Sequence, residues 1–225
     1  MPNLPRHRCH KVVLSIALIA FLTSAPSFGA ENRDILWDTV STCIDTSAVD
    51  YCTRCSAPRS EIDCRTCRNT TQVWAESKEF VVVRDRKMCD CPEGFVHGLA
   101  IPRSRVTGVE DPDRPDGIWE FAWAAGARRL PENQIALAVN PKGRRGQDQL
   151  HVHIVRLRSG SLPADTRRSV RVDTLRTVWQ AAAGKAAQLD LQDYGVLVTK
   201  GAAGGYLVVI DDGSPEYKFT QADCR

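Results

Sequence analysis

The stretch that most constrains the fold is QLHVHIV, residues 149–155, in which polar and apolar side chains alternate. Alternation with a period of two is typical of a strand with one buried face, because successive side chains point to opposite faces of a sheet. The residues expected to enter the core are Leu150, Val152 and Ile154. The residues expected to lie side by side on the other face are Gln149, His151 and His153. Two of the five histidines of the chain therefore share one face of one predicted strand.

The remaining pattern predicts an α+β fold, with an antiparallel sheet and helices packed on it. Apolar or β-branched runs predict a strand at 79–85 and a strand at 97–106, the second of which ends at Pro102. Two further strands are expected within 134–158, and a hairpin of two strands at 194–211. Helical spacing is present at 33–44, 118–130 and 173–189. Asn32 or Asp34 is expected to cap the first helix. Trp119 and Trp123, one turn apart in the second helix, are expected to be core residues.

The first 30 residues have the three-part layout of an export signal. Arg6, Arg8 and Lys11 precede the apolar run VVLSIALIAFL and the small and turn residues TSAPSFGA. A run this short does not comfortably span a bilayer. We therefore predict a signal peptide, with an uncleaved signal anchor as the alternative. The mature chain is expected to be periplasmic, or attached to the membrane facing the periplasm.

Charge and length add two limits. The three basic residues of the signal account for the whole net charge of +3, so the rest of the chain is near neutral. A near-neutral chain has no electrostatic footprint for nucleic acid, and we expect no nucleic-acid partner. Residues 31–225 have a length that suits one domain.

Export changes how the cysteines are interpreted. An even number of cysteines follows the signal: Cys43, Cys52, Cys55, Cys64, Cys67, Cys89, Cys91 and Cys224. In an oxidising compartment this favours disulfides, which would staple the Cys-rich segment 43–91 onto the domain. Two Cys-x-x-Cys pairs, at 52–55 and 64–67, also suit a zinc knot or a redox-active pair, and these alternatives stay open. Cys89 and Cys91 cannot easily bond to each other, so each is expected to pair elsewhere.

A loop with glycines and basic residues, NPKGRRGQ at 140–147, leads into the histidine strand. Backbone amides at Gly143 and Gly146, beside three basic side chains, would suit a phosphate, although the same basic side chains would also suit a solvated surface. A His-x-His pair on a strand is also able to chelate zinc. Such a site would need a third ligand, from His97 or a carboxylate.

These motifs resemble the histidine-triad superfamily, where a strand with alternating histidines follows an Asn–Gly–Gln loop. The segment AVNPKGRRGQDQLHVHIVRLR carries the resemblance, and HGLAIPRSRV is similar to the superfamily's other strand, an apolar run that ends in Ile-Pro and a basic residue. Within it, the chain resembles the exported CDP-diacylglycerol pyrophosphatases from about Trp37 to the C-terminus. FVVVRDR, IPRSRVTGVEDP, IWEFAWAA and YGVLV belong to the same resemblance.

The resemblance implies a hydrolase that cleaves the pyrophosphate bond of CDP-diacylglycerol to CMP and phosphatidate at a membrane surface, without a cofactor or a metal ligand. The middle histidine of the triad is the superfamily's nucleophile, and His151 occupies that position. It would form a cytidylyl-histidine that water hydrolyses. His153, Gln147 and the Gly146 amide would stabilise the phosphoryl charge.

Other substrate contacts are implied by position. Asn140 would order the loop or bind a phosphate oxygen. His97 and Arg103 would contact the nucleotide from the neighbouring strand. Gln149 stands where the superfamily has its first histidine, and we count it with the substrate-binding residues, although glutamine holds no proton.

That departure leaves alternatives open. If the register is shifted by two, His153 becomes the nucleophile; we favour His151. A degraded triad would suit a non-catalytic nucleotide- or lipid-binding exported protein. The Cys-rich segment, whose cysteine density we do not associate with the family, would suit an interaction module.

Overall fold

The computed structural model describes residues 32–44, 73–88, 91–163 and 166–224. The chain divides into residues 1–30 and residues 31–225, and every described residue belongs to the second unit. The predicted export signal and both Cys-x-x-Cys pairs lie outside the described residues, so those interpretations stay predictions.

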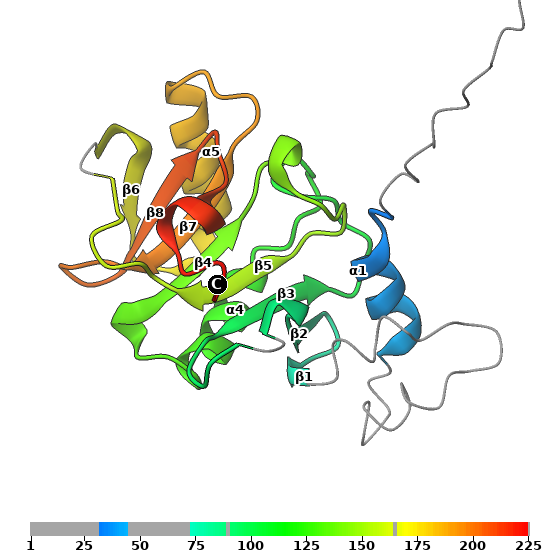
Figure 1. Cartoon of the computed structure of the whole chain (residues 1–225). Helices are drawn as coiled ribbons and strands as arrows, with labels where there is room; N and C mark the ends of the chain where they lie inside the picture. The colour runs from blue at the N-terminus through cyan, green and yellow to red at the C-terminus, as the bar shows by residue number, and fades with distance from the viewer. Residues whose placement is uncertain (1–31, 45–72, 89–90, 164–165, 225) are drawn as a thin grey trace, which may run out of the picture. The chain divides into compact units, whose positions relative to one another are not determined.

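An eight-stranded antiparallel sheet forms the centre of the second unit (Figure 1). The strands lie in the order β1-β2-β3-β5-β4-β7-β8-β6. In chain order they are β1 (Val73–Glu76), β2 (Phe80–Arg84), β3 (His97–Pro102), β4 (Ile135–Val139), β5 (Val152–Arg156), β6 (Ser169–Val172), β7 (Gly195–Lys200) and β8 (Tyr206–Asp211).

The helices are short. They are α1 (Ile35–Asp38), which continues as a π-helical turn at Thr39–Cys43, α4 (Ile118–Ala127), α5 (Val178–Gln188) and α6 (Pro215–Phe219). Single 3-10 turns lie at Arg86–Met88, Glu132–Gln134, Lys142–Arg144, Thr166–Arg168 and Leu175–Thr177. The longest of the described helices, α5, has 11 residues, and no helix in this part of the chain could cross a membrane.

The predicted α+β architecture is confirmed, with three elements that the sequence analysis missed. β1 and β6 have four residues each: VWAE of β1 does not alternate, and SVRV of β6 alternates over only four residues, the shortest run that indicates a strand. The third missed element, α6, has only five residues, too few for a helical repeat to be recognised. Its N-terminus is capped by Ser214, whose hydroxyl accepts a hydrogen bond from the Tyr217 amide.

One face of the sheet is covered by α4 and α5, and this side holds the largest core cluster. Trp119 and Trp123 are buried there as expected, and the rings of Trp119 and Trp179 meet edge to face with centroids 4.7 Å apart. Leu150, Val152 and Ile154 enter the same cluster. The predicted orientation of the histidine strand is therefore correct.

The opposite face carries two smaller core clusters with the histidines between them. Leu36 and Val40 of the first helical segment pack over β2 and β3, and Phe219 of α6 packs over β4, β7 and β8. His153 pairs with Leu99 of the first cluster on one side and with Ala138 of the second on the other. The polar face of β5 is consequently framed by α1 and α6.

A disulfide joins Cys91 to Cys224, as expected from the prediction that Cys91 does not pair with Cys89. The two cysteines are 133 residues apart in the sequence, so the bond restricts a large loop in the unfolded chain. We expect the Cys91→Ser/Cys224→Ser variant to lose about 2 to 4 kcal/mol of unfolding free energy. Urea denaturation of this variant and of the oxidised parent measures the difference. An unchanged midpoint would show that the bond does not contribute to stability.

Candidate active site

The histidine face of β5 opens into a cavity of about 440 Å³. His151 and His153 line it, together with side chains from α1, from the turn after β2, from the loop before β5 and from α6. The other lining residues are Ile35, Leu36, Asp85, Lys87, Leu99, Asn140, Arg144, Arg145, Gly146, Gln147, Glu216 and Tyr217. The structure therefore gathers segments from both ends of the described chain around the two histidines.

His151 lies immediately before β5, and its ring is held in one tautomer. Its Nδ1 is 2.7 Å from the backbone oxygen of Gln149, which accepts hydrogen bonds only. Nδ1 therefore carries the proton and donates it to that oxygen. The lone pair of the neutral ring is then on Nε2, and no group in the described part of the chain is paired with this atom. A neutral imidazole with Nε2 available in a cavity has the form of a nucleophile.

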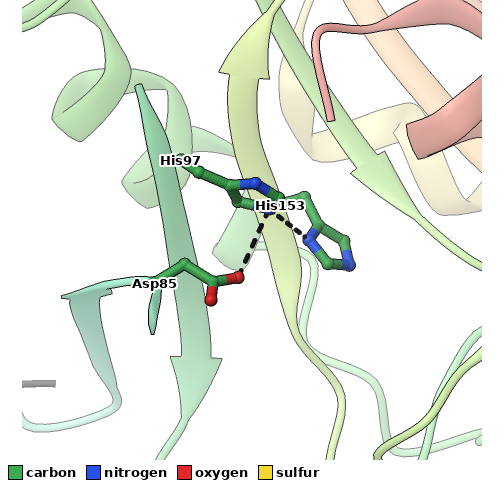
Figure 2. A group of neighbouring side chains, drawn as sticks. All are labelled: Asp85, His97 and His153. Atoms are coloured by element: carbon green, nitrogen blue, oxygen red, sulfur yellow. Dashed lines mark hydrogen bonds and ion pairs between the residues drawn. The ribbon is translucent and has the colours of Figure 1, made fainter. Parts of the chain in front are cut away.

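His153 forms a pair with His97 of β3. His97 Nε2 is 2.9 Å from His153 Nδ1, and the Asp85 Oδ2 atom lies 3.4 Å from His97 Nε2 (Figure 2). The other nitrogen of His97, Nδ1, lies 3.2 Å from the backbone oxygen of Ala222 in the C-terminal tail. His97 is fully buried, so the structure places it behind His153 and outside the lining of the cavity.

Glu216 of α6 is the hub of this buried network. Lys87 Nζ donates to its Oε1 at 2.5 Å, and Asn140 Nδ2 donates to its Oε2 at 2.7 Å. His153 Nε2 lies 3.3 Å from the same Oε2 atom. The Ser214 hydroxyl donates to Asn140 Oδ1 and so fixes the orientation of that amide. A carboxylate this buried is stable because an ammonium group and an amide both donate to it.

Burial sets the protonation of the three histidines. It lowers the pKa of His151 and of His97, although Asp85 and Glu216 act in the opposite direction on both rings. It lowers the pKa of His153 still further, and the neighbouring His151, His97 and Lys87 add to this effect. Burial also acts to lower the pKa of Lys87, but the Glu216 carboxylate prevails and raises it above its usual value. The histidines are therefore neutral and Lys87 is charged at physiological pH.

The basic loop before β5 is only partly available to a ligand. Asp193 accepts the backbone amides of Lys142 and Gly143, and Arg145 forms a salt bridge with Glu110. Two groups that line the cavity remain: the exposed Arg144 side chain and the Gly146 amide. The expected phosphate loop is thus reduced to these two donors.

Gln147 lines the cavity, but its amide group joins α1 to the loop. Its Oε1 accepts from the Leu36 amide, and its Nε2 donates to the backbone oxygens of Asn32 and Gly146. Arg33 and Asp148 reinforce this junction with a salt bridge at 2.7 Å. Gln147 therefore fixes the position of α1, which lines one part of the cavity.

Three of the predicted substrate contacts have other partners in the structure. Gln149 is buried, donates to the backbone oxygens of Pro102 and Ser104, and accepts from the Val106 amide. Arg103 donates to the Ser77 oxygen and pairs with Glu76, away from the cavity. Asn140 lines the cavity with its amide directed to Glu216. Neither Gln149 nor Arg103 lines this cavity, and their predicted substrate contacts stay predictions.

The sequence analysis assigned no role to Asp85, Lys87, Glu216 or Tyr217. The first two follow directly after β2 in FVVVRDRK, where a charged turn after a strand is ordinary. Glu216 is isolated in the sequence and lies in a helix too short to be recognised. The helix begins with Ser214 and Pro215, a pattern that would have identified it. This pattern does not indicate the role of Glu216.

Asp85, His97 and His153 also form the group best suited to hold a metal ion among the described residues, with ligand atoms that all lie within 4.8 Å of one another. His151 is not part of this group. A His-x-His chelate by His151 and His153, the arrangement considered from the sequence, is therefore not the one that the structure presents.

Comparisons with known proteins indicate the family of the chain. A family model described as CDP-diacylglycerol pyrophosphatase matches residues 31–194. Proteins named CDP-diacylglycerol pyrophosphatase from Mycobacterium bovis and Mycobacterium tuberculosis are 41% identical over 87 residues, which cover 34% of this chain and 32% of each relative. A protein from Mycobacterium leprae, named probable CDP-diacylglycerol pyrophosphatase, is 46% identical over 68 residues and covers 25% of each chain.

The matched segment spans about a third of the length of the Mycobacterium bovis and Mycobacterium tuberculosis relatives. The family match is broader, because it covers well over half of the 225 residues and includes both strands of the histidine pair. The protein belongs to the CDP-diacylglycerol pyrophosphatase family.

Proposed function

We propose that the protein hydrolyses the pyrophosphate bond of CDP-diacylglycerol, giving CMP and phosphatidate, through a covalent nucleotidyl-histidine at His151. The observation that carries this proposal is the His151 ring, which lines the cavity with Nδ1 bound to the Gln149 oxygen and with Nε2 available. Family membership supports the choice of substrate.

Two displacements at one phosphorus complete the reaction. His151 Nε2 attacks the phosphorus of the CMP group, an N–P bond forms, and the P–O bond to phosphatidate breaks. A water molecule then attacks the same phosphorus, the N–P bond breaks, and CMP leaves with the water oxygen. The ring suits both steps, because imidazole is a good nucleophile when neutral and an acceptable leaving group when protonated.

The cavity supplies positive charge and donors for the phosphoryl oxygens. Arg144, Gly146, Lys87 and His153 line the cavity, and the last two lie beside Glu216. Donors that are already in place stabilise the charge that develops during phosphoryl transfer, without further reorganisation. Apolar residues Ile35, Leu36 and Leu99 line the same cavity and suit the less polar parts of a lipid-linked nucleotide.

The bonding of Gln149 favours an enzyme over a degraded binding protein. All three of its hydrogen bonds are to backbone groups, so the side chain orients the start of β5. A glutamine fulfils this role as well as a neutral histidine would, because the role requires no proton transfer. The loss of a histidine at this position is therefore compatible with turnover.

We also propose that the protein acts in an exported location with access to the membrane surface. The disulfide between Cys91 and Cys224 supports this proposal, because such bonds persist mainly in oxidising compartments.

Product analysis with purified protein tests the proposed reaction. We expect release of CMP and phosphatidate in equal amounts from CDP-diacylglycerol, and a comparison with CDP-choline reports whether the lipid is required. Absence of CMP from folded protein that still binds the nucleotide would contradict the hydrolase and favour a binding protein.

The pH profile gives a separate prediction. Only the neutral His151 ring attacks phosphorus, and burial holds its pKa below the usual value of 6.5. On the acidic side, kcat/KM should therefore decline only below pH 6.5, because the protein keeps the neutral ring to lower pH than free histidine does. Initial rates at low substrate concentration across the pH range measure this limb. A midpoint above 6.5 would contradict the assignment.

A further inference from the structure

The inner nitrogens of the His97–His153 pair face each other, and the outer nitrogen of His97 has a hydrogen-bond partner. His97 Nδ1 points to the Ala222 oxygen at 3.2 Å, and a carbonyl oxygen only accepts, so this nitrogen carries a proton. His153 Nε2 is buried and forms no hydrogen bond among the described residues, but it lies 3.3 Å from Glu216 Oε2. A lone pair on Nε2 would face that carboxylate, so we assign the proton of the neutral ring to Nε2. In the neutral rings, both protons are then on the outer nitrogens.

This assignment leaves two lone pairs directed at each other. His97 Nε2 and His153 Nδ1 are 2.9 Å apart, a distance that is repulsive between two acceptors unless a cation lies between them or beside them. The Asp85 carboxylate converges on the same point, with Oδ2 3.4 Å from His97 Nε2. Two lone pairs and one carboxylate oxygen therefore converge on one buried position (Figure 2).

We propose that Asp85, His97 and His153 bind one divalent transition-metal ion of the zinc class, through Asp85 Oδ2, His97 Nε2 and His153 Nδ1. Two nitrogens and one oxygen are a donor set that zinc accepts, with bonds of about 2.0 to 2.2 Å. Tetrahedral bonds of this length separate neighbouring ligand atoms by about 3.3 Å. The distances of 2.9 and 3.4 Å found here lie on either side of that value.

The surroundings match those of metal-binding histidines. A ligating histidine usually donates its second N–H to a carboxylate or a backbone oxygen, which fixes the tautomer. Ala222 supplies the backbone oxygen for His97, and Glu216 supplies the carboxylate for His153. Glu216 Oε1 is also 3.6 Å from His97 Nε2 and is the nearest protein atom for a fourth ligand.

Charge balance supports a cation at this position. Asp85 and Glu216 bring two negative charges, and Lys87 brings one positive charge. The buried group thus has an excess of negative charge when the imidazoles are neutral. A divalent cation bound between the ligand atoms would neutralise this excess.

The proposal goes beyond the proposed hydrolysis, because none of the three ligand atoms belongs to His151, the proposed nucleophile. Metal content is measured in the absence of substrate. A failure of the metal proposal therefore leaves the hydrolase untouched, and a failure of the hydrolase leaves the metal proposal untouched.

The test is metal analysis of the untagged, full-length protein after loading with zinc and extensive desalting. We expect about one equivalent of zinc per chain in the parent that is lost in Asp85→Asn and in His97→Ala. Glu216→Gln should retain the ion with about 10- to 100-fold weaker affinity, measured by competition with a chromophoric chelator. His151→Ala is the matched control, because this neighbouring buried histidine is not a ligand and its loss should leave the zinc content unchanged.

Substitution with cobalt separates this site from the cysteines. Nitrogen and oxygen ligands give visible d–d bands without the intense near-ultraviolet thiolate band that a Cys site would add. The spectrum is recorded on the parent protein, so it still identifies the ligand type if a variant fails to fold. Three results would each overturn the proposal. The first is parent protein that binds no zinc, and the second is a thiolate band that disappears in Cys52→Ser/Cys55→Ser. The third is zinc retained in folded Asp85→Asn and His97→Ala.

Discussion

Replacing His151 with alanine should reduce CMP release from CDP-diacylglycerol by on the order of 10⁴-fold or more, because the variant has no atom that forms the bond to phosphorus. The residual rate would come from the donors around the phosphoryl group. Steady-state product analysis measures the loss. Circular dichroism and nucleotide binding establish that the fold and the cavity survive the substitution.

His153→Ala is the matched control for this prediction. His153 is one residue further along the same face and equally buried, but its Nδ1 is directed to His97 and its Nε2 to Glu216. Removing this second histidine of the cavity should reduce kcat by about 10² to 10³-fold and leave measurable turnover, because the proposed nucleophile remains. If His153→Ala is inactive and His151→Ala retains activity, the register is shifted by two and His153 is the nucleophile.

Replacing Glu216 with alanine should destabilise the protein by about 3 kcal/mol, because it leaves the charged Lys87 and the Asn140 amide without their shared acceptor. The same change should lower kcat, since His153 loses the carboxylate next to its Nε2. Urea denaturation measures the stability loss, and initial rates measure the change in kcat.

Two variants show whether the charge is the cause. Glu216→Leu combined with Lys87→Met removes both buried charges and should recover much of the stability that Glu216→Ala loses. Asp212→Ala removes an exposed partner of Arg168 and should cost less than about 1 kcal/mol. A similar loss in Glu216→Ala and Asp212→Ala would contradict the role of Glu216 as the hub of the network.

The sheet was largely predictable because its signals are local. The period-two alternation at 149–155 orients Leu150 and His151 correctly, since a strand leaves only two faces to choose between. The run Val81–Val83 is buried throughout, as expected for an interior strand. The edge strands β1 and β6 carry weaker signals, because each has only four residues and mostly half-buried side chains.

The site was predictable where the histidines and the loop before them carried the signal, because Asn140, Gly146 and Gln147 also line the cavity. His97 and His153 were identified as candidates, but their direct contact depends on the pairing of β3 with β5, which the sequence does not specify. Glu216 reaches them because the chain returns across the sheet after β8, and no periodicity in the sequence reports such a return. Arg103 was expected to contact the nucleotide because it follows Ile-Pro, and its guanidinium binds Ser77 and Glu76 in the structure, which the sequence does not indicate.

The most direct test of the central claim is to trap the covalent intermediate. Protein mixed with CDP-diacylglycerol and quenched under alkaline denaturing conditions, in which an N–P bond survives, is digested and analysed by mass spectrometry. The account predicts a cytidylyl group on the peptide that contains His151, localised to His151 by fragmentation and absent from His151→Ala. CMP release without any such adduct, or an adduct localised to another residue, would contradict nucleophilic catalysis by His151.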